Sequence, residues 1–235
     1  MFDFIKLKAL CAPFFTLTDE MCEQLRLYGE MLIEWNEKMN LTAIKEPDEI
    51  LIKHFYDCLL FLKNVEIPQK AKVIDVGTGA GFPGVVLKIA RPDIDLTLLD
   101  GLNKRITFLN AVLENIGLSA TAVHGRAEEF AKKPEYRETY DIACARAVAR
   151  LNVLTEYCLP FVKSGGQFVS MKGPAAEEEL AEAKKAISVL GGEKGGFFAE
   201  KLPDESQRCF IKIKKLSQTP TKYPRNSGKI TKQPL

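Results

Sequence analysis

A glycine-rich turn at residues 73–84 (VIDVGTGAGFPG) carries the residue types that could do chemistry in this chain. Gly77, Gly79 and Gly81 follow an apolar stretch of strand length and precede a helical pattern. Nucleotide-like ligands bind open α/β sheets at such turns, where glycine lets the backbone approach the ligand without a Cβ in the way. Residues 79–84 also fit the GxGxxG pattern of dinucleotide-binding proteins, so the glycines alone leave the ligand open.

The charge at the turn distinguishes between two possible cofactors, a dinucleotide and S-adenosylmethionine. Asp75 stands two residues before Gly77. A dinucleotide would place its pyrophosphate at the N-terminus of the following helix, where a nearby carboxylate would repel it. The same carboxylate would attract the ammonium and sulfonium groups of S-adenosylmethionine, by on the order of a few kcal/mol in partly buried surroundings. We therefore predict an S-adenosylmethionine site that includes Asp75, Gly77 and Gly79.

Two later positions suit the rest of this cofactor. Asp100 ends the second strand-like run, where a carboxylate can accept both ribose hydroxyls, although NAD-binding proteins also use an acid there. The third run ends at residues 125–128, and Ala127 and Glu128 would offer polar backbone groups to the adenine edge. Acidic residues at this point are equally typical of the first turn of a helix.

The fourth strand-like run ends at Arg146, beside the expected position of the transferred methyl group. This position lacks the Asn/Asp-Pro-Pro-aromatic tetrapeptide of amino-group methylases. Carbon-5 pyrimidine methylases need a nucleophilic cysteine, typically after a proline. Cys144 follows Ala143, so we interpret it as a packed thiol. Guanine N7 needs no general base, because its in-plane lone pair carries no proton and alignment suffices. Arg146 could bind guanine O6 or the cofactor carboxylate, or pair with a neighbouring acid.

Strand and helix patterns alternate along the chain that must position these residues. Apolar runs of strand length occur at 73–76, 95–99, 120–124, 140–144 and 167–171, and helical patterns at 84–91, 103–116, 150–163 and 174–190. This alternation predicts a Rossmann-like fold, in which helices cover both faces of a doubly wound, mostly parallel sheet. With the predicted cofactor, we expect this to be the class I methyltransferase fold. Segments 197–201 and 209–215 have no helix between them and predict an antiparallel hairpin at the sheet edge.

The pattern also predicts three regions. Residues 1–66 form a helical N-terminal extension with amphipathic helices at 18–39 and 48–62, and residues 67–217 form the cofactor-binding domain. Residues 218–235 form a basic tail with little regular structure. From Arg208 onwards the chain has eight basic residues and no acid, which is typical either of a polyanion-binding tail or of a solubilising terminus.

Composition narrows the functional classes. The 235 residues are 46% hydrophobic and 27% charged, as in ordinary globular proteins. The sequence has neither an apolar run of roughly 18 residues nor a secretory signal pattern. Six cysteines without a CxxC pair and two distant histidines predict reduced thiols and no metal site. We expect a cytoplasmic protein.

Further short motifs surround the glycine turn with its Phe82-Pro83-Gly84. They are NLTAI at 40–44, HFYDCL at 54–59, KR at 104–105, GRAE at 125–128, RAVA at 146–149, MKG at 171–173, and YPR with KQPL between 223 and 235. On these motifs the whole chain resembles the bacterial 16S ribosomal RNA guanine-N7 methyltransferase family (RsmG, also called GidB). The resemblance implies methyl transfer from S-adenosylmethionine to N7 of a guanine in 16S rRNA, either free or in the small ribosomal subunit.

The resemblance also implies roles for single residues. It assigns cofactor contacts to Gly77, Phe82, Ala127, Glu128 and Arg146. It also bears on His54 and Asp57 in the helix motif and on Lys172 at the end of the fifth strand.

His54 on an apolar helical stripe is typical of a core residue that Asp57 orients. In the family motif the two residues could instead position the loop at 40–44 over the active site, or contact the substrate together with Arg146. Lys172 could face an RNA phosphate or be an exposed lysine at a strand end.

In the tail, the resemblance favours RNA phosphates as the partner of the basic side chains Lys222, Arg225, Lys229 and Lys232. We expect a chain that ends at Leu216 to keep cofactor binding and to bind RNA more weakly. Asn226 and Ile230 depart from the lysine and proline that are more usual in the family. Competing hypotheses are a methyltransferase for another RNA, a small molecule or a protein, a NAD-dependent oxidoreductase, and a non-catalytic RNA-binding scaffold.

Overall fold

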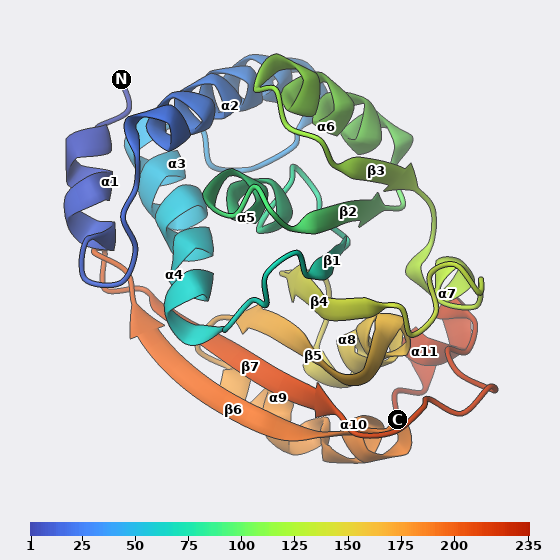
Figure 1. Ribbon diagram of the computed structural model, residues 1–235. Helices are drawn as coiled ribbons and strands as arrows, with labels where there is room; N and C mark the ends of the chain where they lie inside the picture. The colour runs from blue at the N-terminus through green and yellow to red at the C-terminus, as the bar shows by residue number, and fades with distance from the viewer.

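A seven-stranded sheet runs through the centre of the computed structural model, which describes residues 1–235 (Figure 1). The strands are β1 (Lys72–Val76), β2 (Asp95–Asp100), β3 (Thr121–His124), β4 (Tyr140–Arg146), β5 (Val162–Lys172), β6 (Gly192–Lys201) and β7 (Gln207–Lys215). Their order is β3-β2-β1-β4-β5-β7-β6, and β7 runs antiparallel to both of its neighbours. The prediction of a doubly wound sheet with an antiparallel edge hairpin is confirmed.

Residues of the central strands alternate between two apolar cores. Val73 of β1 packs into a cluster with the N-terminal helices, whereas Ile74 and Val76 face a second cluster on the opposite side of the sheet. Strands that are buried on both faces read as continuous apolar runs, which is why the sequence predicts them well. Because β1 pairs with β2 on one side and β4 on the other, the connections diverge there and leave a crevice at the carboxyl ends of the strands.

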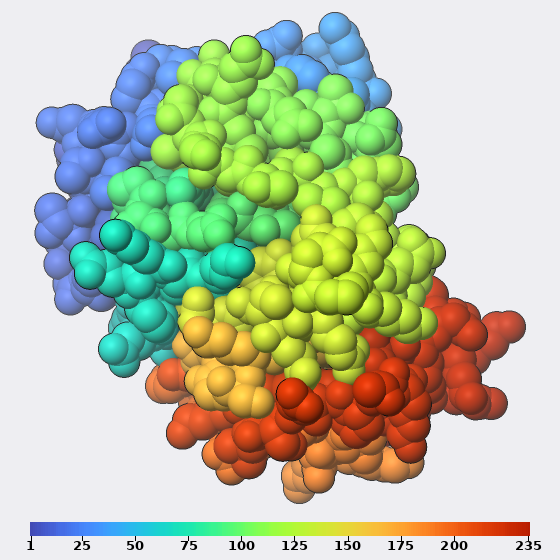
Figure 2. Space-filling model, turned by 45° about the vertical axis from the view of Figure 1, so that its right-hand side comes forward, coloured from blue at the N-terminus to red at the C-terminus, as the bar shows by residue number.

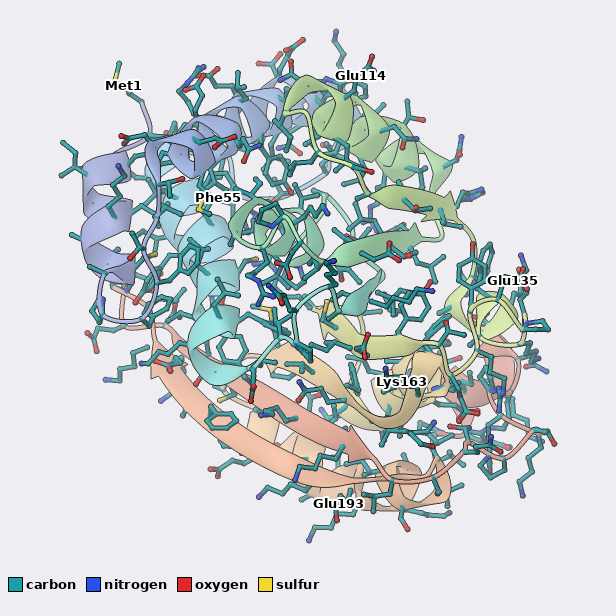
Figure 3. The ribbon with its side chains drawn as sticks, in the orientation of Figure 1. Met1, Phe55, Glu114, Glu135, Lys163 and Glu193 are labelled. Atoms are coloured by element: carbon teal, nitrogen blue, oxygen red, sulfur yellow. The ribbon has the colours of Figure 1, made fainter.

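Helices cover both faces of the sheet (Figure 1). On one face lie α1 (Phe4–Cys11), α2 (Asp19–Met39), α4 (Asp57–Asn64), α5 (Gly84–Ala90) and α6 (Asn103–Asn115), and on the other lie α8 (Leu151–Cys158), α9 (Ala176–Glu182) and α10 (Lys184–Val189). Phe55 is fully buried among the first group, while labelled charged side chains such as Glu114 and Glu193 lie at the periphery (Figure 3). None of the helices is both long and apolar enough to span a membrane.

Three helical predictions need correction in detail. The segment predicted as one helix at 48–62 consists of α3 (Pro47–Ile50), a π-helix η1 (Leu51–Tyr56) and α4. The helix predicted at 150–163 ends as α8 at Cys158 and continues as a 3-10 turn η2 (Leu159–Phe161). The helix predicted at 174–190 is divided into α9 and α10. Apolar periodicity locates helical segments, but it does not report a change of helix type.

The prediction that the tail has little regular structure is wrong. Its end forms α11 (Ser227–Lys232), and the Asn226 side chain caps this helix by accepting a hydrogen bond from the Lys229 backbone N–H at 2.9 Å. Ile230 is fully buried and Tyr223 nearly so. The two residues that depart from the family pattern, Asn226 and Ile230, are therefore the cap and the buried side chain of α11.

Candidate functional site

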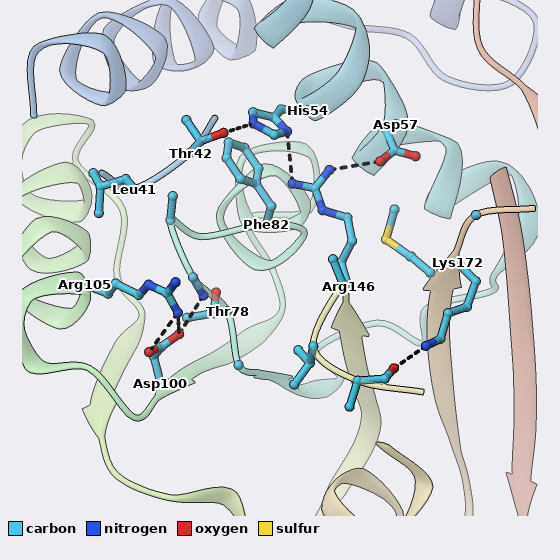
Figure 4. Close-up of a pocket in the computed structure, with 18 of the residues that line it drawn as sticks. Leu41, Thr42, His54, Asp57, Thr78, Phe82, Asp100, Arg105, Arg146 and Lys172 are labelled. Atoms are coloured by element: carbon cyan, nitrogen blue, oxygen red, sulfur yellow. Dashed lines mark hydrogen bonds and ion pairs between the residues drawn. The ribbon is translucent and has the colours of Figure 1, made fainter. Parts of the chain in front are cut away.

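A cleft of about 950 Å³ opens at the carboxyl ends of the parallel strands (Figure 4). It is formed by the glycine turn, the loop after α2, the π-helix and the ends of β2, β4 and β5. The cleft brings together eight of the residues predicted from the sequence: His54, Asp57, Gly77, Gly79, Phe82, Asp100, Arg146 and Lys172.

The glycine turn leaves backbone open to this cleft. Gly77 and Gly79 have φ angles of +70° and +62°, which residues with a Cβ rarely adopt. A Cβ on Gly77 would lie 2.7 Å from Val148, so this position has no room for a side chain. A Cβ on Gly79 would meet nothing within 4 Å, because that face of the turn opens to the cleft. The turn therefore forms a cradle that a ligand can enter.

Asp75 lies beneath the turn and not in the cleft, contrary to the expected approach of its carboxylate to the ligand. The side chain is fully buried, and its Oδ2 accepts hydrogen bonds from the Thr78 hydroxyl at 2.7 Å and the Gly84 N–H at 2.8 Å. Burial raises the pKa of Asp75 to about 6. The other oxygen, Oδ1, is buried without a hydrogen-bond partner. These contacts make Asp75 a support for the turn.

Asp100 links the turn to α6 from the cleft wall. Its carboxylate accepts hydrogen bonds from the Gly79 and Leu102 N–H groups, both at 2.9 Å, and pairs with Arg105 at 3.0 Å. Arg105 was not predicted as a site residue, although it belongs to the KR motif. Asp100 thus lies at the end of β2 in the cleft wall, where neighbouring donors fix its carboxylate.

A smaller cavity of about 150 Å³ adjoins the cleft and shares Gly77, Asp100 and Arg126 with it. Ala127 and Glu128 line this cavity at the start of α7 (Ala127–Phe130), directly after β3. The buried Glu128 carboxylate lies 3.3 Å from the Arg126 guanidinium. The acids form the first turn of a helix, as one interpretation expects, and the same residues line the small cavity.

Arg146 is the centre of a polar cluster on the opposite wall (Figure 4). Its guanidinium donates to the Lys53 carbonyl at 3.1 Å and to Asp57 Oδ2 at 2.9 Å. It also lies 3.1 Å from His54 Nδ1. Nδ1 can accept from this guanidinium or donate to the Lys53 carbonyl oxygen, which is also 3.1 Å away, but one tautomer cannot do both. Nε2 lies 3.0 Å from the Thr42 hydroxyl, which ties His54 to the loop after α2.

His54 is a neutral group. Its burial and the charge of Arg146 lower its pKa to about 3. The imidazole stacks on Phe82 with ring centroids 4.3 Å apart, and the Arg146 guanidinium lies over the same ring at 4.9 Å. The geometry combines two of the sequence readings, because His54 is buried and also holds the loop at the cleft.

The π-helix η1 supplies the Lys53 carbonyl and His54 to this cluster, and Asp57 follows it as the first residue of α4. Wider helical turns of this type are frequent at functional sites. The sequence showed the residues but not the helix type that presents them.

Arg208 is a residue that the sequence analysis did not assign to the site. It enters from β7, and its guanidinium lies 3.3 Å from Asp57 Oδ1. Its only signal in the sequence was its place at the start of the acid-free stretch. Altogether seven basic residues line the cleft, against the three acids Asp57, Asp100 and Glu179. The basic residues are Lys53, Arg105, Arg126, Arg146, Arg150, Lys172 and Arg208.

The other predicted RNA contacts fall in different surroundings. Lys172 is not an exposed lysine, because its ammonium pairs with Glu179 at 2.8 Å and donates to the Ala149 carbonyl. Arg225 forms a bidentate pair with the buried Glu156, donating from Nε to Oε1 at 2.9 Å and from Nη2 to Oε2 at 2.6 Å. The side chains of Lys222, Lys229 and Lys232 lie on the surface, outside the cleft.

Two further observations concern cysteine nucleophiles and metal ions. Cys144 is fully buried, and burial raises its pKa well above the ordinary value, as expected for a packed thiol. The structure contains no group of three or more His, Cys, Asp or Glu side chains that could hold a metal ion.

Comparison with known proteins identifies the family. The family model described as GidB, rRNA small subunit methyltransferase G, matches residues 21–206. The protein named ribosomal RNA small subunit methyltransferase G from Desulforamulus reducens is 51% identical over 223 residues, which are 94% of this chain and 93% of that protein. Its namesake from Alkaliphilus oremlandii is 53% identical over 221 residues, covering 93% and 92%.

A solved structure shows the fold in a protein of low sequence similarity. The crystal structure of M. jannaschii TYW2 in complex with AdoMet has a TM-score of 0.51 at 11% identity and covers 63% of this chain and 70% of that one. The family model matches residues 21–206, and the two relatives named above match nearly the whole chain. The chain therefore belongs to the GidB family of rRNA small subunit methyltransferase G proteins.

Proposed function

We propose that this protein transfers the methyl group of S-adenosylmethionine to N7 of a guanine in 16S ribosomal RNA. One observation carries the proposal: an open glycine cradle with an adjoining small cavity faces a cleft wall on which basic residues outnumber acidic ones. The cradle suits a nucleoside cofactor, and the guanidinium and ammonium groups of the wall, each paired with an acid in the structure, suit a polyanion whose phosphates can compete for them. Membership of the family supports the same substrate class.

The residues present fit the cofactor. The open face of Gly79 leaves room for it, and Asp100 lies between the cradle and the small cavity. We place the ribose at Asp100 and the adenine against Ala127 and Glu128 in the small cavity. The remainder of the cofactor would lie along the turn towards Phe82. When bound, S-adenosylmethionine supplies a methyl group made electrophilic by its sulfonium.

The surrounding side chains would act by holding the guanine in line with this methyl group. Arg146 is fixed by the Lys53 carbonyl, Asp57 and His54, so its remaining N–H donors point in set directions. No group is needed to remove a proton, because N7 carries none. His54 is unsuited to that task, since both of its ring nitrogens already lie within hydrogen-bond distance of neighbouring protein groups. Alignment and a preorganised polar wall would supply the catalysis.

The experiment that tests this proposal combines binding with transfer. Calorimetry should show binding of S-adenosylmethionine and none of NAD. With a radioactive methyl group in the cofactor, label should enter 16S rRNA and not 23S rRNA or a mixture of metabolites. Label in metabolites alone would favour the small-molecule alternative, and binding of NAD in place of S-adenosylmethionine would exclude methyl transfer.

A further inference from the structure

The C-terminal segment, residues 218–235, touches the small cavity that we assign to adenine. Ser227 Oγ accepts a hydrogen bond from Arg126 Nη2 at 2.8 Å and another from the Tyr157 hydroxyl at 3.3 Å. Arg126 and Tyr157 both line this cavity, Arg126 from the turn after β3 and Tyr157 from α8. A serine oxygen has two acceptor lone pairs, so Ser227 can satisfy both donors at once.

The position of Ser227 is set by a firm attachment of the segment to α8. Two residues before it, Arg225 forms hydrogen bonds of 2.6 and 3.1 Å to Glu156 Oε2, and its backbone N–H donates to Oε1 at 2.8 Å. Glu156 is fully buried, so this pair compensates a charge that would otherwise be costly to bury. Buried Ile230 holds the other side of Ser227.

A second attachment fixes the start of the segment. Arg137 donates to the Thr219 carbonyl at 2.7 Å and to the Tyr223 carbonyl at 2.9 Å, while Glu138 accepts from the Thr219 N–H at 2.7 Å. In the space-filling view the red C-terminal segment lies against the body of the protein (Figure 2). The segment is therefore part of the folded protein. It contacts Arg126 and Tyr157, which line the small cavity, from the outer side of that cavity's wall.

We propose that the C-terminal segment completes the adenine end of the cofactor site, with Ser227 as the residue that positions Arg126 and Tyr157. This inference rests on the proposed function, because it takes the small cavity as the adenine site. It replaces the expectation that a chain ending at Leu216 binds the cofactor normally. The segment thus serves the cofactor as well as offering lysines to RNA.

The test uses the full chain with single substitutions at Ser227. Ser227→Ala removes both hydrogen bonds, whereas Ser227→Thr keeps the hydroxyl. Thr221→Ala is the matched control, since Thr221 is exposed on the same segment and its side chain makes no hydrogen bond in the structure. Calorimetry measures the dissociation constants of S-adenosylmethionine and of 5′-methylthioadenosine, which contains the adenosine half alone.

We expect Ser227→Ala to weaken the binding of both ligands by the same factor, about fivefold, because a hydrogen bond that orders a cavity wall is lost. Ser227→Thr should restore affinity, and Thr221→Ala should match the wild type. Unchanged affinity in Ser227→Ala would overturn the inference, as would a loss seen with the whole cofactor but not with its adenosine half. Failure of the wild type to bind S-adenosylmethionine would instead refute the proposed function.

Discussion

Asp75 supports the glycine turn from beneath. Its carboxylate lies under the glycine turn, where it receives hydrogen bonds from Thr78 and Gly84 and is shielded from the cleft. Spacing along the chain placed it near the turn, but spacing cannot tell which side of the turn a side chain faces. Its charge can still act on a ligand across the turn, while its hydrogen bonds set the turn's shape.

A substitution separates these two effects. Burial raises the pKa of Asp75 to about 6, so the folded state binds this proton more tightly than the unfolded chain does. The stabilising contribution is therefore full below about pH 4 and is lost as the pH rises through about 6, at a cost on the order of 2–3 kcal/mol. We expect Asp75→Asn to gain stability relative to the wild type over this range, as measured by chemical denaturation. A stability difference that is constant with pH would contradict the burial argument.

His54 leads to a prediction about rate. Because burial and the charge of Arg146 lower the pKa of His54 to about 3, the imidazole stays neutral at working pH. The single-turnover rate of methyl transfer should thus not show the titration of a histidine between about pH 5 and pH 8, where an ordinary histidine loses its proton. The matched variant His54→Gln should show a lower rate with the same flat profile. A wild-type profile with a group that titrates in this range, and that disappears in His54→Gln, would assign His54 to proton transfer.

The glycine turn and the neighbouring strand end could be predicted to meet because their residues lie close together in sequence. Gly77, Gly79 and Phe82 belong to one turn, and Asp100 ends the adjacent strand. The pairing of Arg146 with Asp57 joins residues that are 89 positions apart, and no local pattern reports such a contact. Sequence reasoning therefore leaves Arg146 with three possible partners, and the structure identifies the neighbouring acid among them as Asp57.

At the scale of elements, helix α2 takes part in building the site. Tyr28 on this helix donates its hydroxyl hydrogen to the Ala80 carbonyl in the glycine turn. Its ring packs against Phe82 at 5.3 Å and against Phe108 of α6 at 6.4 Å. The N-terminal helices and the sheet share one apolar core, so the extension braces the turn from behind.

Removing the Tyr28 hydroxyl tests this brace. Tyr28→Phe keeps the ring and leaves the Ala80 carbonyl without its buried donor, which should cost about 1–3 kcal/mol of stability. We also expect weaker S-adenosylmethionine binding, since the turn loses a fixed point. Tyr56→Phe is the control, because Tyr56 is also buried but its hydroxyl has no hydrogen bond in the structure. Equal cofactor affinity in the two variants would show that the turn keeps its shape without Tyr28.

The elements differ in how visible they are in the sequence. The central strands are apolar on both faces, so they stand out, and the edge hairpin was predicted from the absence of an intervening helix. The π-helix and α11 did not stand out. The first keeps nearly the apolar spacing of an ordinary helix, and the second is anchored by Arg225 and Glu156, which are 69 positions apart.

For the whole molecule, the contribution of the C-terminal segment's charge to RNA binding has to be tested separately from the segment's contribution to folding. Deleting the segment would leave Glu156 buried without Arg225 and would remove Ser227, so a truncated chain reports on folding and cofactor binding together. Substituting exposed lysines changes the charge alone. Lys222, Lys229 and Lys232 are suitable because they lie on the surface outside both cavities.

We expect the triple variant Lys222→Gln, Lys229→Gln and Lys232→Gln to bind S-adenosylmethionine normally and to bind 16S rRNA more weakly. If all three lysines contact phosphates, the slope of log affinity against log salt should be less steep by roughly 2–3 than in the wild type. Filter binding at several salt concentrations measures this slope. An unchanged slope would mean that the basic wall of the cleft holds the RNA without these lysines.

The central claim is that this protein methylates a guanine of 16S rRNA at N7. The most direct measurement incubates the protein and S-adenosylmethionine with 16S rRNA from cells that lack the corresponding gene, and then maps 7-methylguanosine along the RNA. We expect this modification to form at a single guanine, to require S-adenosylmethionine, and to be absent from the same RNA without the protein. Methyl transfer to another base or another guanine atom, or none to this RNA in a protein that binds the cofactor, would contradict it.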